Sequence, residues 1–238
     1  MSIKSKYYVR EISKNEAEDL IINYHYLKDS KFLSIYSYGL VNRKTEEIVG
    51  CAVYYLPQGT LAIKSWFGDL EDKKGIYELN RLVMSPKITI KNATSYLLGN
   101  SLKQLHKIHK AKAVISLADT SRHVGFIYQA TNFKYYGVTR EKTDFYTYSE
   151  TNTGKIKKNV RGSTKNTEGV WLPRTRKHRY AICFDKTLKV NFEQLPYPKN
   201  NENIKVKSCC ENSKVVYDAR FNTYYTCPLC TKKLEKIK

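Results

Sequence analysis

The first residue suited to chemistry is a carboxylate at the end of a predicted strand. The apolar run Val114–Ala118 has the length of a β-strand, and Asp119 follows it directly. Thr120 and Ser121 come next and favour the start of a helix. Because ligands of open α/β sheets gather at the carboxyl ends of strands, Asp119 is a candidate catalytic residue.

A histidine and a tyrosine follow the first predicted helix. Ser13 and Glu16 match a capping box, and apolar residues then recur at helical spacing, which predicts a helix over residues 14–24. His25 and Tyr26 come at its C-terminal end. Two hypotheses apply to this pair: packing, with an imidazolium favoured by the helix dipole, or proton transfer and contact with a nucleobase.

An arginine lies inside a predicted central strand. The run Ile76–Met84 is apolar except for three polar residues, among them Glu78 and Arg81. A charge in such a strand is costly unless it is paired or functional. Arg81 therefore either forms a structural ion pair with Glu78 or Asp119, or binds a phosphate or carboxylate in a cleft.

Further predicted elements would position these side chains. The aromatic segment around Trp66 is expected to be an irregular connection, and a helix is expected to begin after Asn92. His106 and His109, near the end of that helix, are expected on a solvated surface, with metal binding as the alternative. The other predictions are hairpin strands at 32–41 and 48–55, a helical segment that follows Asp119 and ends at Asn132, and strands at 144–148 and 179–184.

The composition indicates a globular protein with a polyanionic partner. Of 238 residues, 41% are hydrophobic and 13% aromatic, which argues against disorder. There are 42 Lys and Arg against 22 Asp and Glu, a formal net charge of +20. Nucleic acid is the favoured partner, and a generally basic, solvated surface is the alternative. No apolar run reaches the ~20 residues of a membrane helix and the N-terminus lacks a signal peptide's apolar centre, so we expect no membrane contact and a cytoplasmic location.

Residues 155–179 form a strongly basic segment within a predicted insertion at about 153–178. The segment holds nine Lys or Arg and one Glu and lacks the apolar content to fold alone. It is expected to be a flexible insertion or a loop that nucleic acid orders. The candidate DNA-binding residues are Arg161, Lys165, Arg174, Arg176, Lys177 and Arg179.

Four cysteines lie in a C-terminal tail beyond a Pro-rich linker, which divides the chain into a main domain at 1–195 and a basic tail at 196–238. Cys227 and Cys230 have the two-residue spacing of a zinc knuckle, and Cys209 and Cys210 would complete a structural zinc site. Because Cys209 and Cys210 are adjacent, which is poor geometry for two ligands of one metal, the fourth ligand stays open. An unmetallated tail is the alternative.

The element order resembles that of the GNAT acyltransferase fold. Tyr128, Asn132-Phe133 and Gly137 resemble the Tyr…Gly-Phe…Gly pattern of that fold, with Asn in place of Gly in a left-handed turn. The resemblance implies an α/β (α+β) fold with a mixed twisted sheet flanked by helices, to which the cysteine tail adds a small appendage. It also implies that Tyr128 lines a donor channel.

The same resemblance implies a donor site before the helix that begins after Asn92. The glycine-rich loop with which GNAT enzymes bind the pyrophosphate of acetyl-CoA is missing here. Thr94 and Ser95 at the helix N-terminus, with Lys91 nearby, would hold phosphate instead. The expected cofactor is an acyl-group donor of unknown identity, with acetyl-CoA among the candidates.

A more specific resemblance is to the phage Mom family, a divergent GNAT branch that modifies adenine in DNA. It covers roughly residues 24–180 and rests on His25-Tyr26, the strand segment 78–82, Asp119, the run 125–133 and His178-Arg179-Tyr180. It implies transfer of a carbamoylmethyl (acetamido) group to N6 of adenine in double-stranded DNA. That modification would protect phage DNA from restriction in the host cytoplasm.

This resemblance assigns roles to the candidates. Asp119 or His25 would accept the amine proton, Tyr26 would stack on or orient a flipped adenine, and Arg81 would bind the donor's phosphate or carbonyl. The basic segment and the tail would grip the duplex, and a homodimer is compatible with the sequence. Two other classes stay open: an acetyl-CoA-dependent N-acetyltransferase acting on a protein or small molecule, and a non-catalytic nucleic-acid-binding protein in which Asp119 and Arg81 form an internal ion pair.

Overall fold

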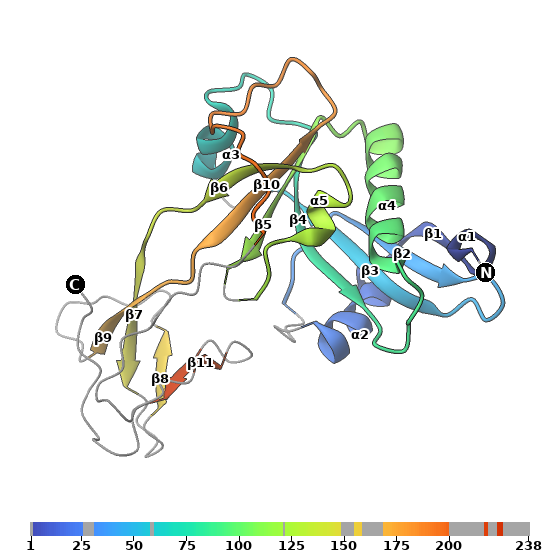
Figure 1. Ribbon diagram of the computed structural model, residues 1–238, viewed down its shortest axis with the longest axis horizontal. Helices are drawn as coiled ribbons and strands as arrows, with labels where there is room; N and C mark the ends of the chain where they lie inside the picture. Colours follow the sequence, from blue (N-terminus) through green and yellow to red (C-terminus); the bar gives the residue numbers. More distant parts are fainter. Residues whose placement is uncertain are drawn as a thin grey trace.

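The described part of the chain contains two β-sheets, which a two-stranded ribbon joins (Figure 1). The computed structural model describes residues 2–25, 31–57, 60–120, 122–148, 155–158, 169–199, 217–218 and 223–225. Helices cover both faces of the larger sheet. The fold is therefore a mixed α/β twisted sheet flanked by helices, as the sequence predicted.

The described helices are α1 (Ile3–Lys6), α2 (Lys14–Tyr24), α3 (Thr60–Phe67), α4 (Ala93–His109) and α5 (Phe126–Gln129). The larger sheet contains β1 (Tyr7–Ile12), β2 (Tyr36–Asn42), β3 (Ile48–Tyr55), β4 (Ile76–Met84), β5 (Ala113–Asp119), β6 (Lys134–Val138) and β10 (Lys177–Cys183), in the order β1-β2-β3-β4-β5-β10-β6. The smaller sheet contains β7 (Thr143–Tyr148), β8 (Lys155–Lys158), β9 (Gly169–Pro173), β11 (Tyr217–Asp218) and β12 (Thr223–Tyr225), in the order β11-β12-β8-β7-β9. None of the described helices has the length and apolarity needed to cross a bilayer.

The first long helix begins and ends where the sequence predicted. Ser13 Oγ accepts a hydrogen bond from Glu16 N at 3.2 Å, and the Glu16 carboxylate accepts one from Ser13 N at 2.7 Å. This capping box satisfies two amides that would otherwise lack a helical partner. α2 ends at Tyr24, and His25 is its C-cap.

At the centre of the larger sheet, β4 and β5 run parallel and then separate. They pair over three residues each, from Ile76 opposite Ala113 to Glu78 opposite Ile115. Beyond Glu78 the two strands splay apart toward their C-terminal ends (Figure 1). Arg81 and Asp119 lie on these diverging segments, beyond the paired residues.

The two faces of the larger sheet carry different helices. α4 packs on one face against Leu79 and Val114, and we call this the α4 face. α2 packs on the opposite face against Val53 and Val83. α3 lies on that same face against Ile115, since Ile115 and Val114 are consecutive strand residues and point to opposite sides. We call it the α2 face.

A β-bulge in β4 turns two consecutive side chains toward the α2 face. The register between β3 and β4 shifts by one residue, which leaves Asn80 as the extra residue. Leu79 and Leu82 both pack toward α4, so Asn80 and Arg81 between them face α2. Asn80 Nδ2 accordingly donates to the carbonyl oxygen of Leu33, just beyond α2, at 3.1 Å.

The ribbon between the sheets continues the pairing of β6 with β10 into that of β7 with β9. Thr139 N donates to Lys177 O at 2.8 Å, and Arg174 N donates to Lys142 O at 2.7 Å. In the smaller sheet, β8 pairs with β7 on one side and with β12 on the other. The described parts of the basic insertion and of the C-terminal tail thus form strands of one sheet.

One sequence-based expectation about local structure is wrong. The segment around Trp66 is α3 rather than an irregular connection, because its aromatic rings pack into the core beside β5. The expected surface position of the two histidines is confirmed: His106 is exposed, with its ring centroid 4.6 Å from that of Phe184, and His109 is partly exposed, with its ring centroid 3.7 Å from that of Tyr36.

Two other expectations need correction in extent. The described parts of the basic segment form β8 and β9 rather than a flexible loop. Although the segment has too few apolar residues to fold alone, pairing with β7 stabilises both strands. The helical segment after Asp119 is the four-residue α5. The left-handed turn at Asn132 is confirmed, with φ +65°.

Candidate active site

The splayed end of β5 places the predicted catalytic carboxylate on the α2 face. Asp119 is the last residue of β5 and only 9% exposed. Lys177 lies opposite it on β10, and Lys177 Nζ donates to Asp119 Oδ2. The sequence had offered Asp119 as the structural partner of Arg81. In the structure a lysine expected to contact DNA compensates this nearly buried charge.

The turn after β5 folds two further polar residues back over Asp119. The amides of Arg122 and His123 donate to the carbonyl oxygen of Asp119 at 3.0 and 3.2 Å. Gly125 N donates to His123 Nδ1 at 3.1 Å, so the neutral ring carries its proton on Nε2. Desolvation of the ring lowers the pKa of His123; the Asp119 charge opposes this shift, and the Arg122 and Lys177 charges add to it.

His25 reaches the same face from the end of α2. It is 7% exposed, and burial followed by the positive charges of Arg81 and Arg122 lowers its pKa to about 4. His25 is therefore neutral near pH 7, and the expected imidazolium at the helix dipole is wrong. A neutral imidazole there can accept or donate a hydrogen bond. The predicted partner of His25, Tyr26, lies outside the described residues.

Arg81 is held by the residue before it. Arg81 Nη1 donates to Asn80 O at 2.9 Å and to Asn80 Oδ1. Because Asn80 Nδ2 in turn donates to Leu33 O, the orientation of the Asn80 amide is set. The guanidinium therefore stands on the α2 face, within electrostatic reach of His25.

A pocket of about 320 Å³ opens on the α4 face, at the N-terminus of α4 and beside α5. Thr94 and Ser95 line it, and Lys91 is an exposed residue just before α4. Among the described residues, the amides of Thr94 and Ser95 have no hydrogen-bond acceptor. These first-turn amides suit an anionic group. The full lining is Met84, Ile88, Ile90, Asn92, Ala93, Thr94, Ser95, Phe126, Ile127 and Ala130.

Tyr128 lies behind this pocket, next to its lining residue Ile127. Tyr128 is 8% exposed, and its ring centroid lies 5.0 Å from that of Tyr180 and 5.5 Å from that of Phe133. Gly125 approaches both tyrosine rings so closely that a Cβ there would lie 2.6 Å from Tyr180 and 2.8 Å from Tyr128. The α4-face pocket thus combines helix amides, an apolar wall and a buried tyrosine, a combination that fits a donor with an anionic group and an apolar arm.

A profile of the Mom protein family matches residues 6–199. The chain belongs to the Mom protein family. The match spans the larger sheet, the ribbon and both faces of the splayed strands. No curated protein matches the chain.

Several solved structures resemble this Mom-family chain. A Bacillus subtilis acetyltransferase in complex with CoA is 12% identical, with 75% of this chain and 99% of that chain covered and a TM-score of 0.45. The ribosomal-protein-S5-alanine acetyltransferase of Vibrio fischeri is 11% identical, with 76% and 94% covered and a TM-score of 0.45. A GNAT family acetyltransferase of Elizabethkingia anophelis with acetyl-CoA bound is 14% identical, with 75% and 99% covered and a TM-score of 0.44. The GNAT-like character of the Mom-family chain rests on its own element order.

The four described candidates for DNA contact all make intramolecular contacts in this Mom-family protein. Arg174 forms a bidentate ion pair with Asp144, with Arg174 Nε 2.9 and 3.0 Å from the two carboxylate oxygens. Arg176 Nε donates to Thr139 O at 2.9 Å. Arg179 donates to a backbone carbonyl and lies over a phenylalanine ring at 4.2 Å, and burial lowers its pKa. Arg174 and Arg176 thus bind β7 and the ribbon, whereas Lys177 and Arg179 bind residues of the larger sheet; DNA contact by all four stays a prediction.

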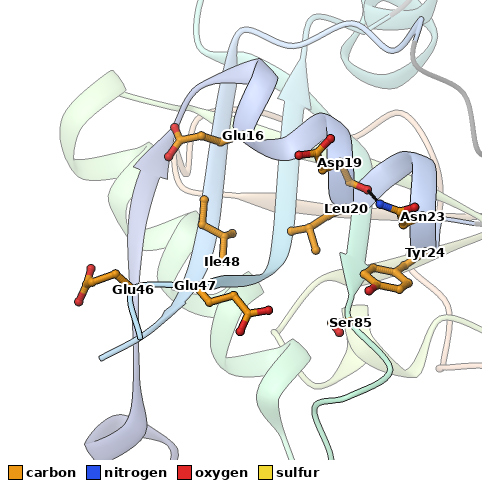
Figure 2. A pocket seen from close by; sticks show the side chains of 9 residues that line it. All are labelled: Glu16, Asp19, Leu20, Asn23, Tyr24, Glu46, Glu47, Ile48 and Ser85. Carbon is orange, nitrogen blue, oxygen red and sulfur yellow. Dashed lines mark hydrogen bonds between the residues drawn. The ribbon is translucent and has the colours of Figure 1, made fainter. Parts of the chain in front are cut away.

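A second pocket, of about 430 Å³, lies beside α2 and is lined by carboxylates (Figure 2). Two of these already have partners: Glu16 serves the capping box and pairs with Arg10, and Glu46 accepts from Tyr8 Oη at 2.6 Å. The pocket lining is Glu16, Asp19, Leu20, Asn23, Tyr24, Glu46, Glu47, Ile48 and Ser85. It does not include any predicted site residue.

The metal prediction falls outside the described residues, as do two of the DNA contacts. Within the described ranges, no three His, Cys, Asp or Glu side chains are grouped as a metal site would require. The residues concerned are Cys209, Cys210, Cys227, Cys230, Arg161 and Lys165. The structural zinc ion therefore stays a prediction.

Sequence reasoning did not identify three residues of the α2 face as part of the candidate site. Arg122 and His123 directly follow Asp119, and their position after a strand's polar end could have identified them. Asn80 could have been found as a polar amide next to an arginine in an apolar strand. Lys177 was named, but its pairing with Asp119 joins residues 58 positions apart and leaves no local signal.

Proposed function

We propose that this protein is a DNA-modifying transferase that adds a carbamoylmethyl (acetamido) group to N6 of adenine in double-stranded DNA, and so protects that DNA from restriction. Membership of the Mom family over residues 6–199 supports this proposal. The observation that carries it is the placement of two dissimilar sites on opposite faces of one pair of splayed strands. Donor and acceptor can then meet between the strands without competing for one entrance.

The donor binds on the α4 face. The amides of Thr94 and Ser95 hold its anionic group, Lys91 adds positive charge, and the apolar wall holds its arm. Acetyl-CoA meets this description in charge and shape, but it would deliver an acetyl group. A carrier with the same charged head and apolar arm would have to hold the carbamoylmethyl group with its leaving group on the methylene carbon, so that the bond to N6 forms as the bond to the carrier breaks. Tyr128 is buried next to the lining residue Ile127, and we expect it to form the inner end of the donor channel.

The adenine approaches from the α2 face. A base in duplex DNA must be flipped out before its N6 can enter a site, and an aromatic amine is a weak nucleophile that needs placement and a proton acceptor. Asp119, or the neutral His25, accepts the proton that N6 loses as the new bond forms. Lys177 holds Asp119 in its charged form and in one orientation. Tyr26 stacks on or orients the flipped base.

Mass spectrometry of nucleosides tests this function. Plasmid DNA would be digested from cells that express the wild-type chain, the variant Asp119→Asn, or the control Asp69→Asn, whose carboxylate is 81% exposed and pairs with Lys64. We expect an adenosine species heavier by one carbamoylmethyl group in the wild type and the control, and none in Asp119→Asn. Folded wild-type protein that binds DNA and leaves every nucleoside unmodified would overturn the proposal.

The α4-face pocket on its own also favours a second candidate, an acetyl-CoA-dependent N-acetyltransferase that acts on a protein or small molecule. Its distinguishing observation is tight binding of acetyl-CoA by the purified chain together with unmodified nucleosides. Calorimetry with acetyl-CoA measures this directly. The variant Ser95→Pro, which removes one first-turn amide, should weaken that binding.

A further inference from the structure

Two guanidinium groups on the α2 face have no role in the proton transfer proposed above. Arg81 comes from the splayed end of β4, and Arg122 comes from the turn after β5. The strands that carry them pair only as far as Glu78 and Ile115, so the two residues stand on either side of the splay. Both charges act on His25, which reaches the α2 face from the end of α2.

Arg81 is oriented before any ligand arrives. The bulge directs Asn80 and Arg81 to the same face, and Asn80 binds Arg81 Nη1 through its backbone and side-chain oxygens. Asn80 is itself fixed by Leu33 O. A guanidinium whose position is set in advance loses less entropy on binding, and its planar fork matches the oxygens of a phosphate.

Arg122 is exposed and is placed by its own backbone. Its amide donates to Asp119 O at 3.0 Å, which fixes the turn immediately beyond the catalytic carboxylate. The positive charges of Arg81 and Arg122 both lower the pKa of the buried His25, so both act on one region.

The charges of this region favour an anion. Lys177 compensates Asp119, and Glu78 is the other carboxylate on the α2 side of the splayed strands. On β4, β5, β10 and the turn after β5, the cations, which include Arg81, Arg122 and Lys177, thus outnumber the carboxylates Glu78 and Asp119, and His25 is neutral near pH 7. The carboxylates Glu16 and Asp19 of α2 line the separate second pocket. The donor's anionic group binds on the α4 face in the proposed function. An anion bound by Arg81 and Arg122 on the α2 face would therefore be a group of the acceptor DNA.

We propose that Arg81 and Arg122 bind the DNA phosphodiester next to the flipped adenine, and that Asn80 is a positioning residue for Arg81. This inference rests on the proposed function. It replaces the earlier expectation that Arg81 binds the donor's phosphate. Clamping the backbone beside the target would hold the flipped nucleotide over Asp119 and His25.

Salt-dependent binding tests the clamp. Affinity would be measured by fluorescence anisotropy for a labelled duplex with one adenine opposite an abasic site, which lowers the energy of flipping. The proteins are the wild type, Arg81→Gln, Arg122→Gln and the control Lys103→Gln, which changes an exposed residue of α4. Each arginine variant should lower the slope of log affinity against log salt by about 0.9 and weaken binding about tenfold. The control should leave both unchanged.

A double-mutant cycle tests the role of Asn80. Asn80→Ala should weaken DNA binding in the wild-type background and have no further effect in Arg81→Gln, whereas a merely structural role would weaken both equally. Thermal melts identify variants that do not fold.

The outcomes separate the clamp from the proposed function. Unchanged salt slopes in folded arginine variants would overturn the clamp, even where nucleosides are modified. Wild-type protein that does not bind the duplex would overturn both. Lowered slopes with unmodified nucleosides would support the clamp and refute the transferase.

Discussion

Replacing Gly125 with alanine should damage the packing behind the donor pocket. Gly125 has φ +82°, where a residue with a Cβ loses about 1–2 kcal/mol. The new Cβ would also lie 2.6 Å from Cε2 of the fully buried Tyr180 and 2.8 Å from Cδ2 of Tyr128. Overpacking of this kind costs about 1–3 kcal/mol. The sum is a loss of about 2–5 kcal/mol, since the Tyr180 ring has no free space into which to move.

Thermal denaturation followed by circular dichroism measures this loss. For a domain of this size, each kcal/mol corresponds to roughly 2–4 °C in Tm, so Gly125→Ala should melt about 4–20 °C lower than the wild type. The matched control is Gly99→Ala in the middle of α4, where a Cβ would meet no atom within 4 Å. Alanine is the better helix former there, so Tm should rise by about 1–4 °C. Equal shifts in the two variants would refute the close packing of Gly125 against the tyrosines.

Three further predictions concern the charged residues of the fold. Lys177→Met removes the lysine that pairs with the nearly buried carboxylate of Asp119, so it should lower the free energy of unfolding, measured by urea titration, by about 1–3 kcal/mol. An unchanged urea midpoint would show that solvent already screens the pair. Because the pKa of His25 is lowered to about 4, the unfolded chain binds a proton that the folded chain does not, so stability should fall as pH drops from about 6.5 to about 4, by up to roughly 3 kcal/mol. A His25→Gln variant should lose that part of the pH dependence, and an equal dependence in both proteins would contradict the lowered pKa. Arg174→Gln breaks the bidentate pair with Asp144, whose side chain is 8% exposed, and should lower Tm; an unaltered Tm would mean that the ribbon does not depend on this pair.

Local sequence signals predicted the elements whose own residues determine them. α2 follows from its capping box and its helical spacing, and β4 follows from its apolar run. α3 was missed because a Pro and two Gly surround it and its aromatic residues suit a loop as well as a helix. β8 and β9 were missed because their pairing comes from β7 and from the C-terminal tail, far along the chain.

The candidate site could be predicted in its residue types but not in its geometry. Asp119, Arg81 and His25 lie on one face in the structure, a grouping that the sequence did not predict. The bulge at Asn80 decides which face Arg81 occupies, and a single extra residue leaves no mark in a hydrophobic pattern. The pairing of Lys177 with Asp119 likewise depends on the register of β10 against β5.

In the proposed arrangement, DNA and donor reach the splayed strands from opposite faces of the sheet, and photo-crosslinking tests this most directly. A benzophenone amino acid would replace Leu33, which is 44% exposed beside Asn80 on the α2 face, or Phe126, which is 65% exposed at the rim of the α4-face pocket. Irradiation with labelled duplex DNA should yield a protein–DNA adduct from position 33 and none from position 126. An adduct from position 126 alone would contradict the arrangement and place the DNA on the α4 face.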